Sequence, residues 1–207
     1  MIDVLIKGIG VGVAVAAPVG PIGLLCIKRT LADGRSAGLA SGLGAASADA
    51  VYGFMVAAGL AATGLLVSYA GAMALFGGTL IAVLGVLSIR AFLTGASDDA
   101  KPAGARVSRG LLSAFATTFT LTFSNPMTIL AFVALVSGLG ASPASHPGAA
   151  YVLVAGVFAG SALWWLLLVM VASTARSRIT PRETRWLDLV SGAVLVIWGL
   201  WIVWGAL

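Results

Sequence analysis

The chain has 207 residues, of which 60% are hydrophobic and only 9% are charged, and its mean hydropathy is +1.08. A soluble domain of this size cannot hide so many apolar residues from water, and a disordered chain needs low hydrophobicity and high charge. Composition therefore excludes both classes and leaves an integral membrane protein. The formal net charge of +5 fits basic loops against an anionic membrane surface, so no nucleic-acid partner is expected.

Six apolar stretches are each long enough to cross a bilayer, which takes about 20 residues. They cover 2–27, 37–66, 71–93, 110–138, 149–174 and 187–206. Short polar connections separate these stretches, and the longest of them is the segment 95–109. We therefore expect an all-α, polytopic fold in which residues 1–207 form a single transmembrane domain of six helices.

The basic residues predict the orientation of these helices. Eleven of the twelve Lys and Arg residues lie in or beside the connections that follow the first, third and fifth stretches. They are Lys28, Arg29, Arg35, Arg90, Lys101, Arg106, Arg109, Arg176, Arg178, Arg182 and Arg185. Because positively charged loops stay in the cytoplasm, we expect these three connections inside the cell and both termini outside.

Two of the stretches contain residues that interrupt a helix. The first holds Pro18 and Pro21 with Gly20 between them, and the fourth holds Asn125 followed by Pro126. Proline removes a backbone donor and clashes with the preceding turn, so paired prolines should unwind a helix. An asparagine followed by proline is typical of a helix N-cap and first helical position. We expect the first and fourth helices to be broken at these prolines.

The two breaks lie at matching depths in oppositely oriented helices. Pro18 lies 16 residues after Ile2, and Asn125 lies 15 residues after Gly110. This pattern predicts two inverted three-helix repeats, 1–94 and 110–207, joined by a cytoplasmic linker over 95–109. Transporters built from inverted repeats place their binding site where the broken helices meet. There, the free N–H groups that begin each half-helix attract an anion such as a carboxylate.

Asp49 is the candidate functional side chain within the membrane. It lies 12 residues from Ala37, which at about 1.5 Å per residue places it about 18 Å deep in a core about 30 Å thick. An ionisable residue at this depth is costly and is functional by default. Three roles remain open: Asp49 binds a substrate ammonium, carries a coupling proton, or caps a neighbouring helix end.

Several smaller residues near these positions have weaker interpretations. Hydroxyl side chains at Thr120, Thr122, Ser124 and Ser161 are candidates for the wall of a cavity. The tryptophans at 164 and 165 fall in the middle of a span, where we favour bundle packing or contact with lipid over contact with a substrate. Glycines spaced four residues apart, such as Gly8 and Gly12, let helices approach closely and would also allow a homodimer.

Taken together, these residues resemble the lysine-exporter and threonine-exporter family (LysE/RhtB). The resemblance rests on Pro18, Gly20 and Pro21, on Asp49 in a glycine-rich second span, and on Asn125 with Pro126, and it covers essentially the whole chain. It implies a multi-pass protein of the bacterial inner membrane that exports amino acids or related small solutes. It also implies that a gradient of protons or sodium drives export, and that these six residues form the site.

Three positions depart from the pattern of many family members. Ile22, Gly23 and Met127 stand where many members have polar or basic residues. Within the resemblance, this difference favours a neutral or apolar amino acid over a basic one.

The sequence therefore predicts a secondary exporter that works by alternating access, with the lipid bilayer, a small-molecule substrate and a coupling ion as its partners. The alternative is a transporter of metal ions or other inorganic ions on a related scaffold, which needs oxygen-rich or His/Cys ligands. One intramembrane carboxylate and no intramembrane histidine argue against that alternative. We expect no enzymatic activity, no cofactor and no metal site.

Overall fold

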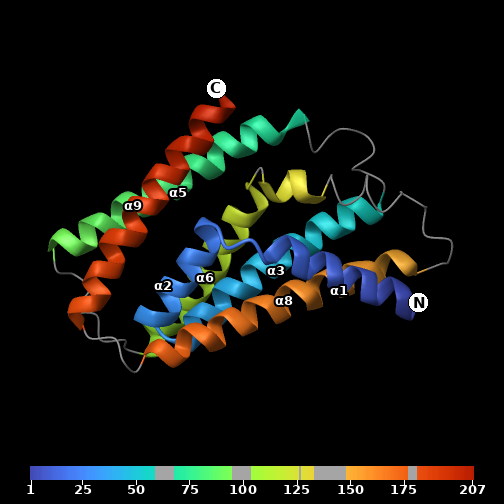
Figure 1. Cartoon of the computed structure of the whole chain (residues 1–207), viewed down its shortest axis with the longest axis horizontal. Helices are drawn as coiled ribbons and strands as arrows, with labels where there is room; N and C mark the ends of the chain where they lie inside the picture. The colour runs from blue at the N-terminus through green and yellow to red at the C-terminus, as the bar shows by residue number, and fades with distance from the viewer. Residues whose placement is uncertain (59–67, 95–103, 126, 133–147, 177–180) are drawn as a thin grey trace.

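The computed structural model describes residues 1–58, 68–94, 104–125, 127–132, 148–176 and 181–207, and within these ranges every regular element is a helix (Figure 1). The helices are α1 (Ile2–Ala16), α2 (Pro21–Ala32), α3 (Arg35–Ala57), α5 (Ala70–Thr94), α6 (Gly104–Phe123), a short helix over 127–132, α8 (Ala149–Arg176) and α9 (Pro181–Ala206). The all-α prediction is therefore confirmed. The helix α6 begins inside the predicted linker 95–109, of which residues 95–103 lie outside the described ranges.

The first apolar stretch is broken where its prolines predict. The helix α1 ends at Ala16, and α2 begins at Pro21 with Gly20 as its N-cap. The two helix axes meet at 83°, which is far more than a gentle bend. Pro21 occupies the first helical position, where its missing N–H has no intrahelical partner to lose.

The fourth apolar stretch is also interrupted. The helix α6 ends at Phe123, Asn125 is not helical, and a new helix covers 127–132. Pro126, which was predicted to start this second piece, lies outside the described residues.

Within the described residues, length and composition identify three or four helices that can cross a membrane, against the six predicted for the whole chain. Three described helices qualify, namely Ala70–Thr94, Ala149–Arg176 and Trp186–Ala206, and the bent pair α1 and α2 makes up to four. The helix α3, which is rich in glycine, alanine and serine, is not among them, and residues 59–66 of its predicted stretch lie outside the described residues. In the stretch 110–138, the described part contains the shorter apolar helix Gly110–Phe123, and residues 133–138 lie outside the described residues. The structure thus supports a membrane-embedded helical protein and leaves the six-helix architecture a prediction.

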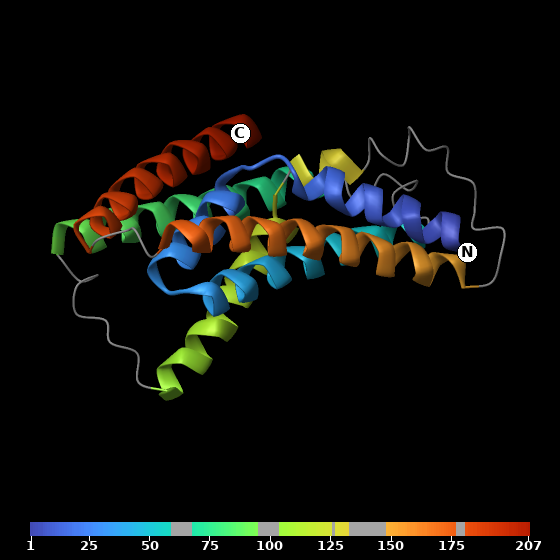
Figure 2. The same cartoon turned by 60° about the horizontal axis from the view of Figure 1, so that its bottom comes forward.

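The long helices pack in pairs through glycines. Figures 1 and 2 show α5 lying along α9, and α1 lying along α8, while α3 contacts both α6 and α8. A Cβ atom added at Gly8 would lie 2.6 Å from the carbonyl oxygen of Leu153, and one at Gly85 would lie 2.7 Å from that of Gly192. Only glycine permits such close backbone approach. These contacts occupy the glycine faces within one chain, and the homodimer stays a prediction.

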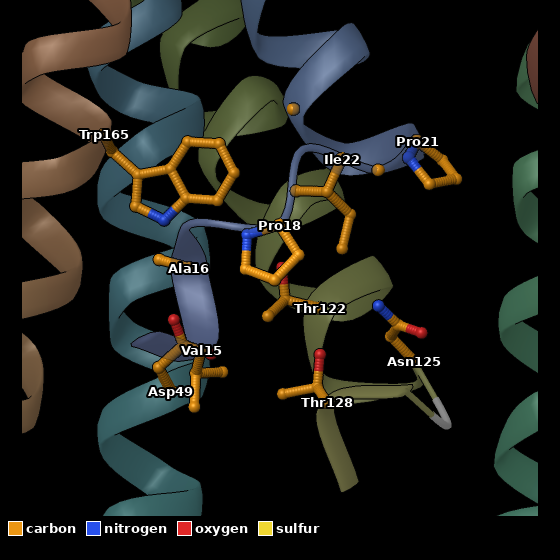
Figure 3. A pocket seen from close by; sticks show the side chains of 12 residues that line it. Val15, Ala16, Pro18, Pro21, Ile22, Asp49, Thr122, Asn125, Thr128 and Trp165 are labelled. Carbon is orange, nitrogen blue, oxygen red and sulfur yellow. The ribbon is translucent and has the colours of Figure 1, made fainter. Parts of the chain in front are cut away.

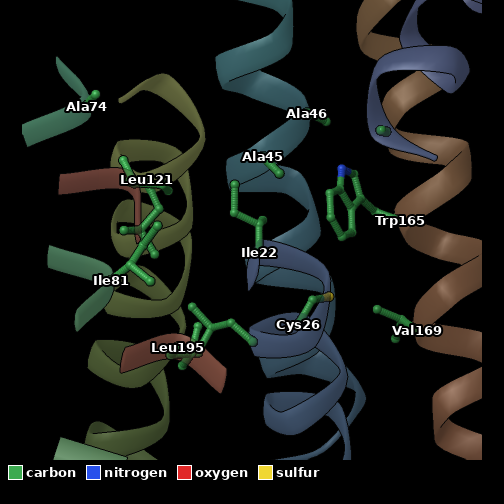
Figure 4. Packing of buried hydrophobic residues seen from close by; sticks show 13 residues of the cluster. Ile22, Cys26, Ala45, Ala46, Ala74, Ile81, Leu121, Trp165, Val169 and Leu195 are labelled. Carbon is green, nitrogen blue, oxygen red and sulfur yellow. The ribbon is translucent and has the colours of Figure 1, made fainter. Parts of the chain in front are cut away.

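The buried core surrounds α2. Cys26 and Ile22 on α2 pack against Ala45 of α3 and against Trp165 of α8 (Figure 4). Leu195 of α9 belongs to the same cluster. Because α2 contacts α3 and α8 as well as α9, it lies at the centre of the protein, directly beside the break that precedes it.

Candidate functional site

A small cavity of about 60 Å³ lies between the two helix breaks (Figure 3). Its wall comes from α1, α2, α3, α6, α8 and the segments at both breaks. The residues that line it are Val15, Ala16, Pro18, Gly20, Pro21, Ile22, Gly23, Asp49, Thr122, Asn125, Thr128 and Trp165. Five of the six predicted site residues are therefore brought together, and the sixth, Pro126, lies outside the described residues.

Asp49 is buried on α3, with 2% of its surface exposed. The hydroxyl of Ser161 on α8 donates a hydrogen bond to Oδ2 of Asp49 at 2.7 Å. The second carboxylate oxygen, Oδ1, is buried and has no hydrogen-bond partner within the described part of the chain. Asp49 therefore lines the cavity with one oxygen held by the protein and one oxygen available to a ligand.

The N-terminus of α2 supplies the opposite polarity. A helix leaves its first N–H groups without intrahelical acceptors and has a partial positive charge at this end. Gly20, the N-cap residue, makes no side-chain cap, so the first N–H groups of α2, which include those of Ile22 and Gly23, receive no cap hydrogen bond from it. Both residues line the cavity. The first break thus presents an anion-binding helix end to the same space as Asp49.

At the second break, the protein satisfies its own helix ends. Oδ1 of Asn125 accepts a hydrogen bond from the backbone N–H of Met127 at 3.1 Å, which confirms the predicted N-cap. The carbonyl of Asn125 also accepts from the N–H groups of Thr128 and Ile129, at 3.1 and 3.2 Å. The amide nitrogen of Asn125 lies on the side of Thr122 (Figure 3).

Tyr52, one turn from Asp49 on α3, contacts the end of α6 at the second break. Its hydroxyl donates a hydrogen bond to the carbonyl of Phe123, the last residue of α6. Its fully buried ring stacks on Phe123 and on Phe132. Tyr52 therefore supplies a hydrogen-bond donor to the end of α6 and packs its ring against residues on both sides of the interruption.

The cavity wall includes residues that the sequence did not predict for the site, among them Val15, Ala16 and Thr128. Trp165 packs in the core, as expected, and it also lines the cavity. A signal was present in its spacing, because Trp165 lies one helical turn after Ser161 and therefore on the same face of α8. That face is the one that Asp49 contacts.

A set of polar contacts, called here the basic-end network, ties α2 to its neighbours at the end where the basic residues gather. The ammonium of Lys28 forms an ion pair with Asp188 on α9 at 2.8 Å and donates to the hydroxyl of Ser88 on α5 at 2.7 Å. The guanidinium of Arg29 donates to Ser41 on α3 and to Thr118 on α6, both at 2.9 Å. The sequence indicated only an orientation signal for these two cations.

The same region contains the carboxyl group of Asp33, the C-cap residue of α2, which is exposed. Partial desolvation raises the pKa of Asp33, and the neighbouring cations Arg29 and Lys28 oppose that shift. Nearby, Arg176 donates through Nε to the carbonyl of Leu31 at 3.2 Å, which secures the end of α2 against α8. Polar contacts with α3, α5, α6, α8 and α9 thus hold the basic end of α2 in place.

Apolar helices of membrane-spanning length, interrupted helices and a small polar cavity between the interruptions are together typical of membrane-embedded transport proteins. The model of the family described as "LysE type translocator" matches residues 13–205. The chain belongs to this family, and the resemblance stated from the sequence is confirmed.

One curated relative supports the same assignment. The chain is 25% identical over 204 residues to a protein of Bacillus subtilis (strain 168) named "Putative amino acid efflux protein YcgF". The similarity covers 96% of this chain and 94% of that protein. No solved structure matches the chain.

Proposed function

We propose that this protein is a secondary-active exporter of amino acids or related small solutes in the bacterial inner membrane, and that it catalyses no chemical reaction. The observation that supports this proposal is one cavity that offers Oδ1 of Asp49 to a cation and the uncapped N-terminus of α2 to an anion. An amino acid has both charged groups. The family, and the name of the Bacillus relative, agree with this substrate class.

We propose further that the chain forms six spans in two inverted repeats, 1–94 and 110–207, connected by 95–109. The pairing of helices supports this architecture. If the two repeats are exchanged, the pair α1 and α8 becomes the pair α6 and α3, which is also present. The pairs α5 with α9 and α3 with α8 map onto themselves, and both are present. The two helix breaks correspond in the same exchange.

In the proposed orientation, the basic end faces the cytoplasm and both termini lie outside. The basic-end network then closes the cytoplasmic side, because Lys28 joins α2 to α5 and α9 while Arg29 joins it to α3 and α6. Opening toward the cytoplasm requires these contacts to separate. Rocking of one repeat against the other would alternate access to the cavity, driven by a gradient of protons or sodium.

The proposal is tested by amino-acid efflux from cells loaded with a panel of dipeptides. Cells that express the protein should release one or a few amino acids faster than cells without it, and Asp49→Asn should abolish the difference. Ser47→Ala is the matched control, because Ser47 lies on the same helix, is absent from the cavity wall and donates its hydroxyl to the carbonyl of Leu43 in its own helix. Equal efflux from the Asp49→Asn variant, at equal protein level, would rule out the proposed role of Asp49.

A second assay separates the two functional roles of Asp49. In proteoliposomes, gradient-driven efflux requires the coupling ion, whereas exchange of substrate for substrate does not. If Asp49 carries the coupling proton, Asp49→Asn should lose gradient-driven efflux and keep exchange. If Asp49 binds the substrate ammonium, both activities should fall together. Replacing the proton gradient with a sodium gradient in the same vesicles identifies the coupling ion.

A further inference from the structure

Three side chains of the cavity wall contain a buried polar atom that lacks a hydrogen-bond partner within the described residues. These atoms are Oδ1 of Asp49, Oγ1 of Thr122 and Nε1 of Trp165. The three residues are exposed by only 2%, 4% and 6%. Folded proteins satisfy nearly all buried polar groups, so several unsatisfied groups around one space indicate a missing partner.

Thr122 differs from other threonines of the protein in a way that supports this interpretation. A helical threonine commonly donates to the carbonyl of the preceding turn. Thr117 and Thr118 of the same helix do so, and Thr30 of α2 does the same. The hydroxyl of Thr122 is buried and makes no such bond. It is therefore available to a ligand in the cavity.

The orphaned atoms of Asp49 and Trp165 have complementary chemistry. A carboxylate oxygen of Asp49 accepts hydrogen bonds and attracts a cation, whereas an indole N–H of Trp165 can only donate. Figure 3 shows the indole nitrogen and the carboxylate on the same side of the cavity, with Ala16 near both. The N–H groups at the start of α2 are further donors. Together with the indole N–H of Trp165, they can bind an anionic group.

We infer that Trp165 and Thr122 contact the transported solute, and that this solute is a neutral zwitterion with a short apolar side chain. The inference rests on the proposed function and deepens it. Asp49 would hold the ammonium, while Nε1 of Trp165 and the α2 N–H groups hold the carboxylate. Among the described residues of the cavity wall, Asp49 is the only charged side chain, so a second charge on the solute would lack a partner there. The apolar wall residues Val15, Ala16 and Ile22 suit a short aliphatic side chain.

The test uses counterflow of labelled L-alanine in proteoliposomes containing the full chain. Trp165→Phe keeps an aromatic ring and removes the N–H, and we expect the apparent KM for L-alanine to rise about tenfold while the maximal rate changes less than twofold. Trp164→Phe is the matched control, because the indole nitrogen of Trp164 is also buried without a partner among the described residues, and Trp164 does not line the cavity. This variant should resemble the wild type.

Competition by ethylamine distinguishes direct contact from altered packing. Ethylamine has the ammonium of alanine and no carboxylate, so its inhibition of counterflow should be the same in the wild type and in Trp165→Phe. A purely structural role of Trp165 would weaken alanine and ethylamine equally. Thr122→Val should raise the KM for L-alanine severalfold, whereas Thr117→Val, on an outward-facing position of the same helix, should not.

The outcomes separate the inference from the proposed function. If the wild type exports amino acids and Trp165→Phe leaves the KM for L-alanine unchanged, the contact is overturned and the exporter stands. Equal loss of alanine and ethylamine binding also overturns it. Stronger competition by L-lysine than by L-valine overturns the neutral substrate class. If the wild type moves no amino acid, the proposed function fails and the inference fails with it.

Discussion

The two helix breaks face the same cavity, but their helix ends are capped differently. Protein side chains bond to the helix ends at the second break, whereas the helix that begins at the first break has no side-chain cap from its N-cap residue. At the second break, Asn125 caps the new helix and the hydroxyl of Tyr52 bonds to the last residue of α6. At the first break, Gly20 supplies no side-chain cap to the N–H groups that begin α2. The protein therefore closes one interruption with its own side chains and leaves the other for a ligand.

Packing around the two breaks differs less than their capping. Each break has one exposed apolar side chain, Val19 at 56% and Met127 at 53%, but the second break also lies against a buried cluster that includes Tyr52 and Phe132. A buried aromatic cluster resists rearrangement because its side chains are closely packed. We expect the second break to be the fixed side of the cavity and the first break to be the side that binds and moves.

The largest effect should come from giving the first break the cap of the second. Gly20→Asn should place an amide oxygen over the start of α2, in competition with the substrate, and transport should fall at least tenfold. The fold should tolerate the change, because a Cβ at Gly20 meets no atom within 4 Å and its φ is −106°. Helix stability should rise by a few tenths of a kcal/mol. Counterflow and thermal unfolding measure the two effects.

Gly20→Ala is the control for this substitution, since it adds a Cβ without an acceptor. This variant should keep most of the transport activity. Full transport by Gly20→Asn would show that the open end of α2 has no part in binding.

Removing the hydroxyl of Tyr52 should destabilise the second break. Tyr52→Phe keeps both ring contacts but leaves the carbonyl of Phe123 without its donor. An unsatisfied buried group of this kind costs about 1–3 kcal/mol, which thermal unfolding of the purified protein would detect. The KM for substrate should change little, because the hydroxyl bonds to the backbone. A large rise in KM with unchanged stability would instead place Tyr52 in the binding site.

A smaller loss is expected from removing the cap itself. Asn125→Ala should lower the free energy of unfolding by about 1 kcal/mol. Asn125→Ser should recover most of that loss, because serine also caps helices well. If transport in the serine variant is as poor as in the alanine variant although stability is restored, the amide nitrogen of Asn125 contacts the substrate.

The sequence predicted those features that depend on local chemistry. The positions of both breaks and the cap at Asn125 follow from the covalent properties of proline and the short side chain of asparagine. Asp49 could be identified because a lone carboxylate in an apolar stretch is costly wherever that stretch packs.

Features that depend on how helices face each other could not be predicted. Trp164 and Trp165 are neighbours that point about 100° apart on a helix, and only the packing of α8 on α3 determines which of them lines the cavity. Likewise, Lys28 reaches α5 and α9 while Arg29 reaches α3 and α6, because α2 turns by 83° relative to α1 into the centre of the protein. The shape of this bend depends on tertiary contacts that the two prolines alone do not specify.

Cys26 can be used to detect opening toward the cytoplasm in the unmodified chain. Cys26 is the only cysteine in the sequence, and it lies on α2 between the cavity and the basic-end network. It is fully buried, and its thiol donates to the carbonyl of Gly38 on α3 at 3.4 Å. A membrane-permeant maleimide can reach it only when α2 separates from α3. The labelling rate therefore reports how often this separation occurs, without any engineered cysteine. Lys28→Gln should increase that rate.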